Sequence, residues 1–107
     1  QLTRNDIVVT DMGLAFTGTH QVFKVKKGQR LFTSSGFASM GWGLPAAIGA
    51  CVADKRRVIC LAGDGGFQMT SQELATVAHY CLPIKILEKL VQEILVPQMC
   101  LELEINI

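Results

Sequence analysis

The feature that most constrains the fold of this chain is a run of five apolar residues that ends in a glycine-rich turn. Residues 58–62 are valine, isoleucine, cysteine, leucine and alanine, and Gly63, Asp64, Gly65 and Gly66 follow directly. A short, continuous apolar run of this kind is typical of a strand covered on both faces, as in a parallel sheet. The run therefore predicts a buried parallel strand whose carboxyl end opens into a tight turn.

Strand and helix patterns alternate on both sides of this turn. Residues 7–10, 31–33 and 83–86 suggest further short strands, whereas residues 12–23 are ambiguous because Gly13 and Gly18 oppose a long helix. Pro45 suits the first turn of a helix. The apolar residues after it have the spacing of one helix face, made up of Leu44, Ala47, Ile48, Cys51 and Val52.

The pattern after the glycine turn indicates another helix. Thr70 and Glu73 have the spacing of a capping box at its start. Its expected inward face consists of Leu74, Val77, Ala78 and Cys81. This alternation predicts an α/β fold with a mainly parallel sheet and flanking helices, and 107 residues suffice for a single domain.

Composition excludes several functional classes. A net charge of +1 with scattered charges gives no support to a nucleic-acid or membrane-surface partner. No apolar run reaches the roughly 20 residues of a membrane span, and residues 1–6 lack a signal peptide's apolar core, so we expect an intracellular, cytoplasmic protein. Neither histidine has a visible catalytic or metal partner. The cysteines lack CxxC spacing and are expected to be buried free thiols: Cys51, Cys60, Cys81 and Cys100.

The glycine turn has three interpretations on its residues alone. Backbone N–H groups between a strand and a helix bind phosphate well, and a carboxylate such as that of Asp64 suits Mg²⁺. A structural turn is the equally open alternative. A dinucleotide site fits less well, because Gln68 replaces its last glycine and Lys85 and Ile86 stand near the position of its acidic residue.

Two long stretches carry a more specific signal. Residues 35–50 and 63–76, in this order and at this separation, closely resemble the diphosphate-binding domain of thiamine-diphosphate enzymes, above all acetolactate synthase and its relatives. The likeness extends over roughly residues 6–86. It implies a thiamine-diphosphate-binding fold, with thiamine diphosphate and Mg²⁺ as cofactors and a 2-oxo acid as the parent enzyme's substrate, in carboligation or decarboxylation.

The resemblance also implies roles for individual residues. Asp64 is expected to bind Mg²⁺, and the backbone of Gly63, Gly65 and Gly66 to face the diphosphate. The segment Ala38, Ser39 and Met40 is expected to hold the aminopyrimidine, with the Met40 side chain supporting the bent cofactor. An ordinary core methionine is the alternative for Met40. Residues 11–17 often touch the diphosphate in the family, although Asp11 and Thr17 equally suit turn caps.

The family pattern breaks near the end of the chain. The family has Asn-Asn after the next strand, one asparagine being the second Mg²⁺ ligand, but Leu90 and Val91 occupy these positions. A strand running into a helix at Ile86–Leu87 also lacks the expected turn residues. Residues 87–107 resemble the helix and strand that close such a domain. Both arguments predict an internal deletion after about Ile86, so that residues 1–107 form one partial domain.

A second element of the family is missing. A glutamate on a separate pyrimidine-binding domain, supplied by the partner subunit of an oligomeric parent, protonates the cofactor ring. No such domain fits in this chain, so we expect no catalysis by the chain alone. A noncatalytic interaction module is the alternative, because residues 99–107 alternate like an unpaired edge strand, and such edges invite association.

Overall fold

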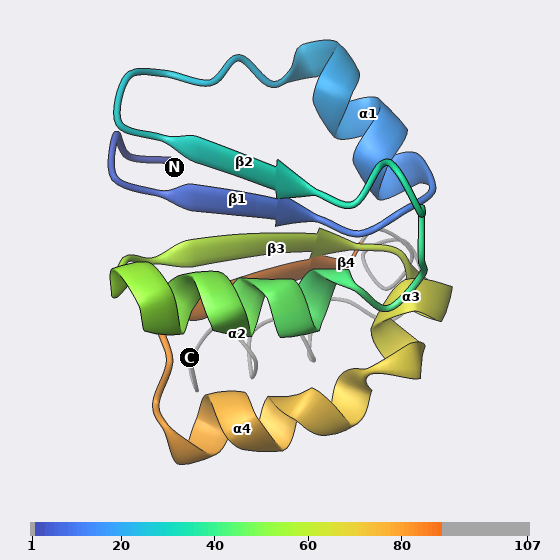
Figure 1. Ribbon diagram of the computed structural model, residues 1–107, viewed down its shortest axis with the longest axis vertical. Helices are drawn as coiled ribbons and strands as arrows, with labels where there is room; N and C mark the ends of the chain where they lie inside the picture. The colour runs from blue at the N-terminus through green and yellow to red at the C-terminus, as the bar shows by residue number, and fades with distance from the viewer. Residues whose placement is uncertain (1, 89–107) are drawn as a thin grey trace.

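The computed structural model describes residues 2–88, which form a parallel sheet with helices on both faces (Figure 1). Within this range, strands and helices follow one another as the sequence predicts for an α/β fold. The elements in chain order are β1 (Ile7–Thr10), α1 (Leu14–Val22), β2 (Arg30–Thr33), α2 (Gly43–Asp54), β3 (Val58–Ala62), α3 (Asp64–Met69), the 3₁₀ turn η1 (Ser71–Glu73), α4 (Leu74–His79) and β4 (Ile84–Glu88).

The sheet has the strand order β2-β1-β3-β4, and all three pairings are parallel. The chain first moves outward from β1 to β2 and then crosses back over β1 to reach β3. The direction of winding therefore reverses between β1 and β3, which are neighbours with Thr10 opposite Leu61. Their carboxyl ends meet at this switch point, the usual place for a ligand site in an open parallel sheet.

The main core lies between the sheet and α2. Alternate residues of the strands point to this face, because successive side chains of a strand point to opposite sides. They pack against α2 and against Val77 of α4. The buried members are Ile7, Val9, Leu44, Ala47, Cys51, Val58, Cys60, Val77, Ile84 and Ile86.

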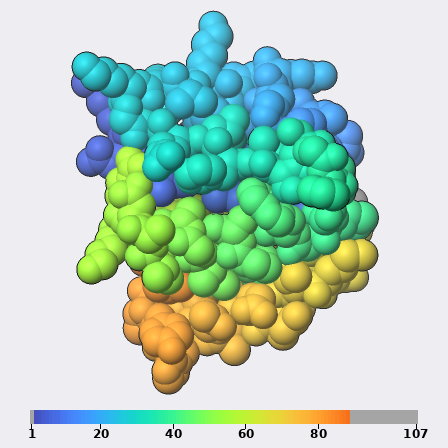
Figure 2. Space-filling view, in the orientation of Figure 1, coloured from blue at the N-terminus to red at the C-terminus, as the bar shows by residue number. Residues whose placement is uncertain are grey.

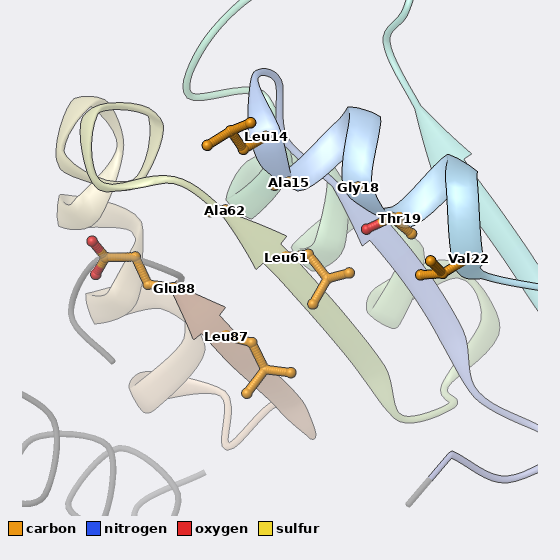
Figure 3. Close-up of a pocket in the computed structure, with 9 residues that line it drawn as sticks. All are labelled: Leu14, Ala15, Gly18, Thr19, Val22, Leu61, Ala62, Leu87 and Glu88. Atoms are coloured by element: carbon orange, nitrogen blue, oxygen red, sulfur yellow. The ribbon is translucent and has the colours of Figure 1, made fainter. Parts of the chain in front are cut away.

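Among residues 2–88, α1 covers only part of the opposite face of the sheet. In Figure 3, α1 lies over β1 on this side, with the ends of β3 and β4 beside it. Leu61 is half-buried and Leu87 is 37% exposed. The prediction of a buried β3 is therefore confirmed for most of its residues, and less so at Leu61.

Two helix predictions need correction. Residues 14–22 do form a helix despite Gly18, but Val52 is 60% exposed and does not belong to the inner face of α2. With 3.6 residues per turn, Val52 lies about 80° around the helix from Leu44, at the rim of the stripe. The buried face is formed by Leu44, Ala47 and Cys51.

The predicted capping box is wrong. The helix after the turn begins six residues earlier than expected, at Asp64, and is interrupted at Thr70. The Thr70 hydroxyl donates to the Gly41 carbonyl at 3.0 Å, and Glu73 accepts from the Thr76 hydroxyl at 3.4 Å. The Thr70 hydroxyl thus bonds to a residue distant in the sequence instead of capping the helix that follows it.

The expected inward face after Leu74 is also too long. Among its members only Val77 is fully buried; Ala78 is exposed, and Cys81 lies beyond the end of α4 with φ of +49°. Cys81 is therefore an exposed thiol, whereas Cys51 and Cys60 are buried as predicted. Burial, together with the charge of Asp11, raises the pKa of the Cys60 thiol to about 12, so this thiol stays protonated.

The last strand is longer than predicted. Leu87 and Glu88 continue β4 in register with Leu61 and Ala62 of β3, so no helix starts at Leu87. The internal deletion after about Ile86 stays a prediction, since β4 shows only that the strand extends to Glu88. The positions of the family's Asn-Asn pair, Cys100 and the alternating tail lie outside the described residues. Within residues 2–88, no helix is long and apolar enough to cross a membrane.

Acid should weaken the fold through one buried ion pair. Arg57 donates to both oxygens of Asp6 at 2.8 and 2.5 Å, and this holds the pKa of Asp6 at about 2, below the ordinary 3.8, although burial opposes the shift. The pair therefore contributes fully above about pH 4, and its contribution is lost as the pH falls through 2.

Asp6→Asn should reduce the free energy of unfolding by about 1–2 kcal/mol at pH 7, allowing for the solvent around Arg57. Urea unfolding of both proteins between pH 7 and pH 2 measures the effect. The difference should shrink below pH 4, since the wild-type carboxyl then becomes neutral too. A difference that stays constant down to pH 2 would contradict this account.

Candidate functional site

The glycine turn after β3 presents the open start of a helix at the switch point. Gly63 is extended and precedes α3, and the first helical bond is donated by the Phe67 N–H to the Gly63 carbonyl at 2.9 Å. Among the described residues, no side chain caps this helix. The N–H groups at the start of this helix therefore have no capping side chain, and Asp64, the first helical residue, is exposed beside them, whereas Gly66 is buried.

A buried carboxylate lies beneath this turn. Asp11 follows β1 directly, is 1% exposed, and donates its own N–H to the Leu61 carbonyl at 2.8 Å. Its Oδ1 accepts from the Met12 N–H at 2.7 Å. The Gly41 N–H lies 3.2 Å from Oδ1 and 3.0 Å from Oδ2, and the Gly43 N–H donates to Oδ2 at 3.2 Å. A charge this deeply buried is stabilised by such amide bonds.

Two glycines allow the chain to pack against that carboxylate. A Cβ at Gly66 would lie 2.9 Å from Oδ2 of Asp11, and one at Gly43 would lie 2.9 Å from Cβ of Asp11. Contacts this short do not occur for real side chains, so only glycine fits at either position. Both the turn at residues 63–66 and the start of α2 are thus held close to Asp11.

The segment 38–41, which includes residues 38–40 that the resemblance assigns to the aminopyrimidine, lies against the glycine turn. Met40 is 51% exposed, and its Cε would be 2.8 Å from a Cβ at Gly65, so the methyl group rests on the turn. Gly41 has φ of +86° and lies close to Met69 and Thr70. Figure 2 shows the surface of the molecule from the side on which α2 and α4 lie.

The backbone of this segment is strained at one position. Ala38 has φ of +54°, in the left-handed region that side chains rarely adopt, and its N–H donates to the Ser34 carbonyl at 2.8 Å. Ser39 and Ala38 are both exposed beside Met40. Strain of about 1–3 kcal/mol per residue persists only where surrounding contacts hold it, and it is frequent at ligand sites.

Glu88 is a second carboxylate near the turn that the sequence reasoning did not single out. It ends β4, opposite Ala62 of β3, and its carboxyl group extends from the strand end (Figure 3). Burial, and then the charge of Asp64, raises the pKa of Glu88. The β3–β4 register could have revealed this neighbour, since Asp64 follows Ala62 by two positions. Within residues 2–88, no cluster of three or more histidine, cysteine, aspartate or glutamate side chains is found.

Neither described histidine belongs to the site. His20 is exposed, with Nδ1 bonded to the Phe16 carbonyl at 2.9 Å, and His79 is exposed with its ring edge-on to Tyr80. Both are therefore surface side chains.

A shallow apolar groove of about 410 Å³ opens beside the site on the α1 face (Figure 3). Its walls come from α1 and from the carboxyl ends of β3 and β4. The residues that line it are Leu14, Ala15, Gly18, Thr19, Val22, Leu61, Ala62, Leu87 and Glu88.

The residues at the switch point fit a magnesium diphosphate group. Gly63 has open space around it, the start of α3 is uncapped, and Asp64 offers an exposed carboxylate beside it. Mg²⁺ is commonly bound by one or two carboxylates together with ligand phosphates. The fold is therefore that of an α/β domain with a glycine turn and an exposed carboxylate at the switch point of a parallel sheet.

Comparison with known proteins identifies the class more closely. The family model described as "Thiamine pyrophosphate enzyme, C-terminal TPP binding domain" matches residues 11–88, and the chain belongs to this family. The match ends where β4 ends and includes the two strand residues beyond the predicted limit at residue 86.

The curated relatives are acetolactate synthase large subunits. Those of Lactococcus lactis and Porphyra purpurea are 46% and 48% identical to this chain over 88 and 87 residues. The isozyme 1 large subunit of Escherichia coli is 42% identical over 84 residues. These alignments cover 78–80% of the chain but only 15% of each relative, so the chain spans a small part of their length.

Gly66→Ala should destabilise the fold even though alanine favours helices. The gain in helix propensity is at most about 1 kcal/mol, whereas forcing a methyl group against the Asp11 carboxylate costs about 1–3 kcal/mol. Gly49→Ala is the matched control, because Gly49 lies in α2 with nothing within 4 Å of its Cβ position. That variant should gain about 0.5–1 kcal/mol in urea unfolding. Equal effects of the two substitutions would contradict the close packing at Gly66.

Proposed function

We propose that this chain is the diphosphate- and magnesium-binding part of a thiamine-diphosphate enzyme that acts on 2-oxo acids, as acetolactate synthases do. The observation that carries the proposal is the contact between the turn at residues 63–66 and the segment 38–41 at the switch point of the sheet. Family membership and identity to acetolactate synthase large subunits support it.

The proposed roles follow the position of each residue. Asp64 binds Mg²⁺, and the backbone N–H groups of Gly65 and Gly66 bind the diphosphate beside the positive end of α3, with Gly63 keeping the approach open. Ala38 and Ser39 present backbone to the aminopyrimidine, and the half-exposed Met40 side chain supports the bend of the cofactor. When bound, thiamine diphosphate supplies the carbanion and electron sink, while the protein supplies position and electrostatics.

We propose further that this chain binds the cofactor weakly and does not catalyse alone. The resemblance places the second Mg²⁺ ligand at Leu90 and Val91, neither of which has a side-chain oxygen. The glutamate that protonates the cofactor ring belongs to a separate domain in the family. The parent is proposed to be an intracellular, cytoplasmic homo-oligomer in which a partner subunit supplies that domain.

A noncatalytic interaction module is the second candidate function. The apolar groove beside α1 favours it, because Leu14 and Val22 at its rim are 72% and 79% exposed. Exposed apolar surface of this kind often marks a contact with another chain. Analytical sedimentation tests it: association supports the module, and a folded monomer at all concentrations contradicts it.

Isothermal titration with thiamine diphosphate, with and without Mg²⁺, tests the cofactor proposal. We expect magnesium-dependent binding with Kd between about 0.1 and 1 mM, because half of the metal clamp is absent. Asp64→Ala should abolish the magnesium dependence. Asp54→Ala is the control, since it removes an exposed carboxylate at the far end of α2.

Three outcomes would contradict the proposal in different ways. Binding that is unchanged in Asp64→Ala would remove Asp64 from the metal site. Tight binding by the wild-type chain would contradict the incomplete clamp. Turnover of pyruvate by the chain alone would contradict its catalytic incompetence.

The deletion hypothesis has a separate test at the level of the gene. We expect the full-length transcript to contain, after the codon for Glu88, a segment encoding an Asn-Asn pair that this chain lacks. A continuous genomic reading frame that matches residues 84–95 without an inserted segment would contradict the deletion.

A further inference from the structure

We propose that Asp11 is the positioning residue of the cofactor site, fixing the aminopyrimidine segment 38–41 against the diphosphate turn 63–66. This inference rests on the proposed function for its significance, but the geometry behind it is independent of any ligand. It concerns a side chain that is 1% exposed, so Asp11 itself touches no cofactor and acts through the backbone around it.

The hydrogen bonds of Asp11 reach segments that are distant in the sequence. Asp11 stands directly after β1, yet two of its three amide donors, Gly41 and Gly43, lie 30 and 32 residues further along the chain. Gly43 is the first residue of α2, a helix of 12 residues with no cap from its own N-cap side chain. The Asp11 carboxylate therefore caps α2 from a neighbouring strand and interacts favourably with the positive end of its dipole.

The same carboxylate also packs against the diphosphate turn, residues 63–66. The Cα of Gly66 approaches so closely that a Cβ there would lie 2.9 to 3.2 Å from three atoms of the Asp11 carboxyl group. Gly66 is the third residue of α3, just after Asp64 and Gly65. One charged group thus contacts both the loop that precedes α2 and the turn that begins α3.

The backbone of segment 38–41 adopts an unusual conformation at two positions. Ala38 and Gly41 both have positive φ, at +54° and +86°. Such a conformation persists only when surrounding contacts over-determine it. The N–H of Gly41 donates to Oδ2 of Asp11 at 3.0 Å. The carbonyl of Gly41 accepts from the Thr70 hydroxyl, also at 3.0 Å. Met40, between these anchored positions, is thereby directed onto Gly65 before any cofactor arrives.

Amide hydrogen exchange of the ligand-free chain tests this role directly. Gly41 lies outside every helix and strand, and Gly43 is in the first turn of α2, so neither amide has a ladder or intrahelical partner to protect it. If Asp11 holds them, both should exchange slowly in the wild-type protein, at rates near those of the β1 amides. Rapid exchange of both in the wild-type chain would overturn the proposal, and this measurement needs no variant.

Asp11→Asn then removes one acceptor oxygen while keeping the shape of the side chain. We expect the exchange of Gly41 and Gly43 to accelerate by about tenfold or more relative to the β1 amides. The Met40 methyl resonance should shift, since its contact with Gly65 loosens. Asp6→Asn is the matched control: it alters another buried aspartate next to β1, but one paired with Arg57, so it should accelerate exchange without selecting Gly41 and Gly43.

The conservative variant separates positioning from charge alone. Asp11→Glu keeps the charge, but the close approach of Gly43 and Gly66 leaves no room for another methylene group, so it should not restore slow exchange. Exchange at Gly41 and Gly43 that is unchanged in Asp11→Asn, or fully restored in Asp11→Glu, would overturn the proposal. Failure of the chain to bind thiamine diphosphate would refute the proposed function while leaving the exchange result to decide the role of Asp11 in holding the loop.

Discussion

The burial of one carboxylate constrains much of this structure. The Asp11 carboxyl group is almost inaccessible to water, so the hydrogen bonds with water that it loses on burial must be replaced by donors of the protein. Backbone amides of Met12, Gly41 and Gly43 provide those donors, and only glycine at positions 43 and 66 lets the chain come close enough. The ends of β1 and β3, the start of α2 and the start of α3 are consequently joined at one point.

That point coincides with the reversal of winding between β1 and β3, where an open parallel sheet leaves space for a ligand. This arrangement explains why segments 38–41 and 63–66, which are more than twenty residues apart in the sequence, form one continuous surface. It also separates the roles of the two aspartates. Asp64 is exposed at the turn and is proposed to meet the metal, whereas Asp11 is buried beneath it and is proposed to hold the backbone.

Much of the fold could be predicted from the sequence, because the signals that carry it are local. The apolar run at 58–62, the glycine turn and the helical spacing after Pro45 each mark an element within a few residues. The family resemblance added the roles expected of residues 38–40 and 63–66 toward the cofactor, but not the contact between Met40 and Gly65. What escaped prediction depends on contacts distant in sequence. Thr70 bonds to Gly41 rather than capping a helix, and Asp11 caps α2 as well as bonding within its own turn. Glu88 is a neighbour of Asp64 only through the β3–β4 register.

The central claim is that residues 38–41 and 63–66 form one preformed cofactor site. A ¹⁵N–¹H correlation spectrum of the chain, titrated with thiamine diphosphate in the presence of Mg²⁺, tests it most directly and detects weak binding. The account predicts saturable shifts concentrated at the amides of these two segments, moving together with one apparent Kd. Shifts confined to one segment, spread over the sheet, or lying only along the α1 groove would contradict it.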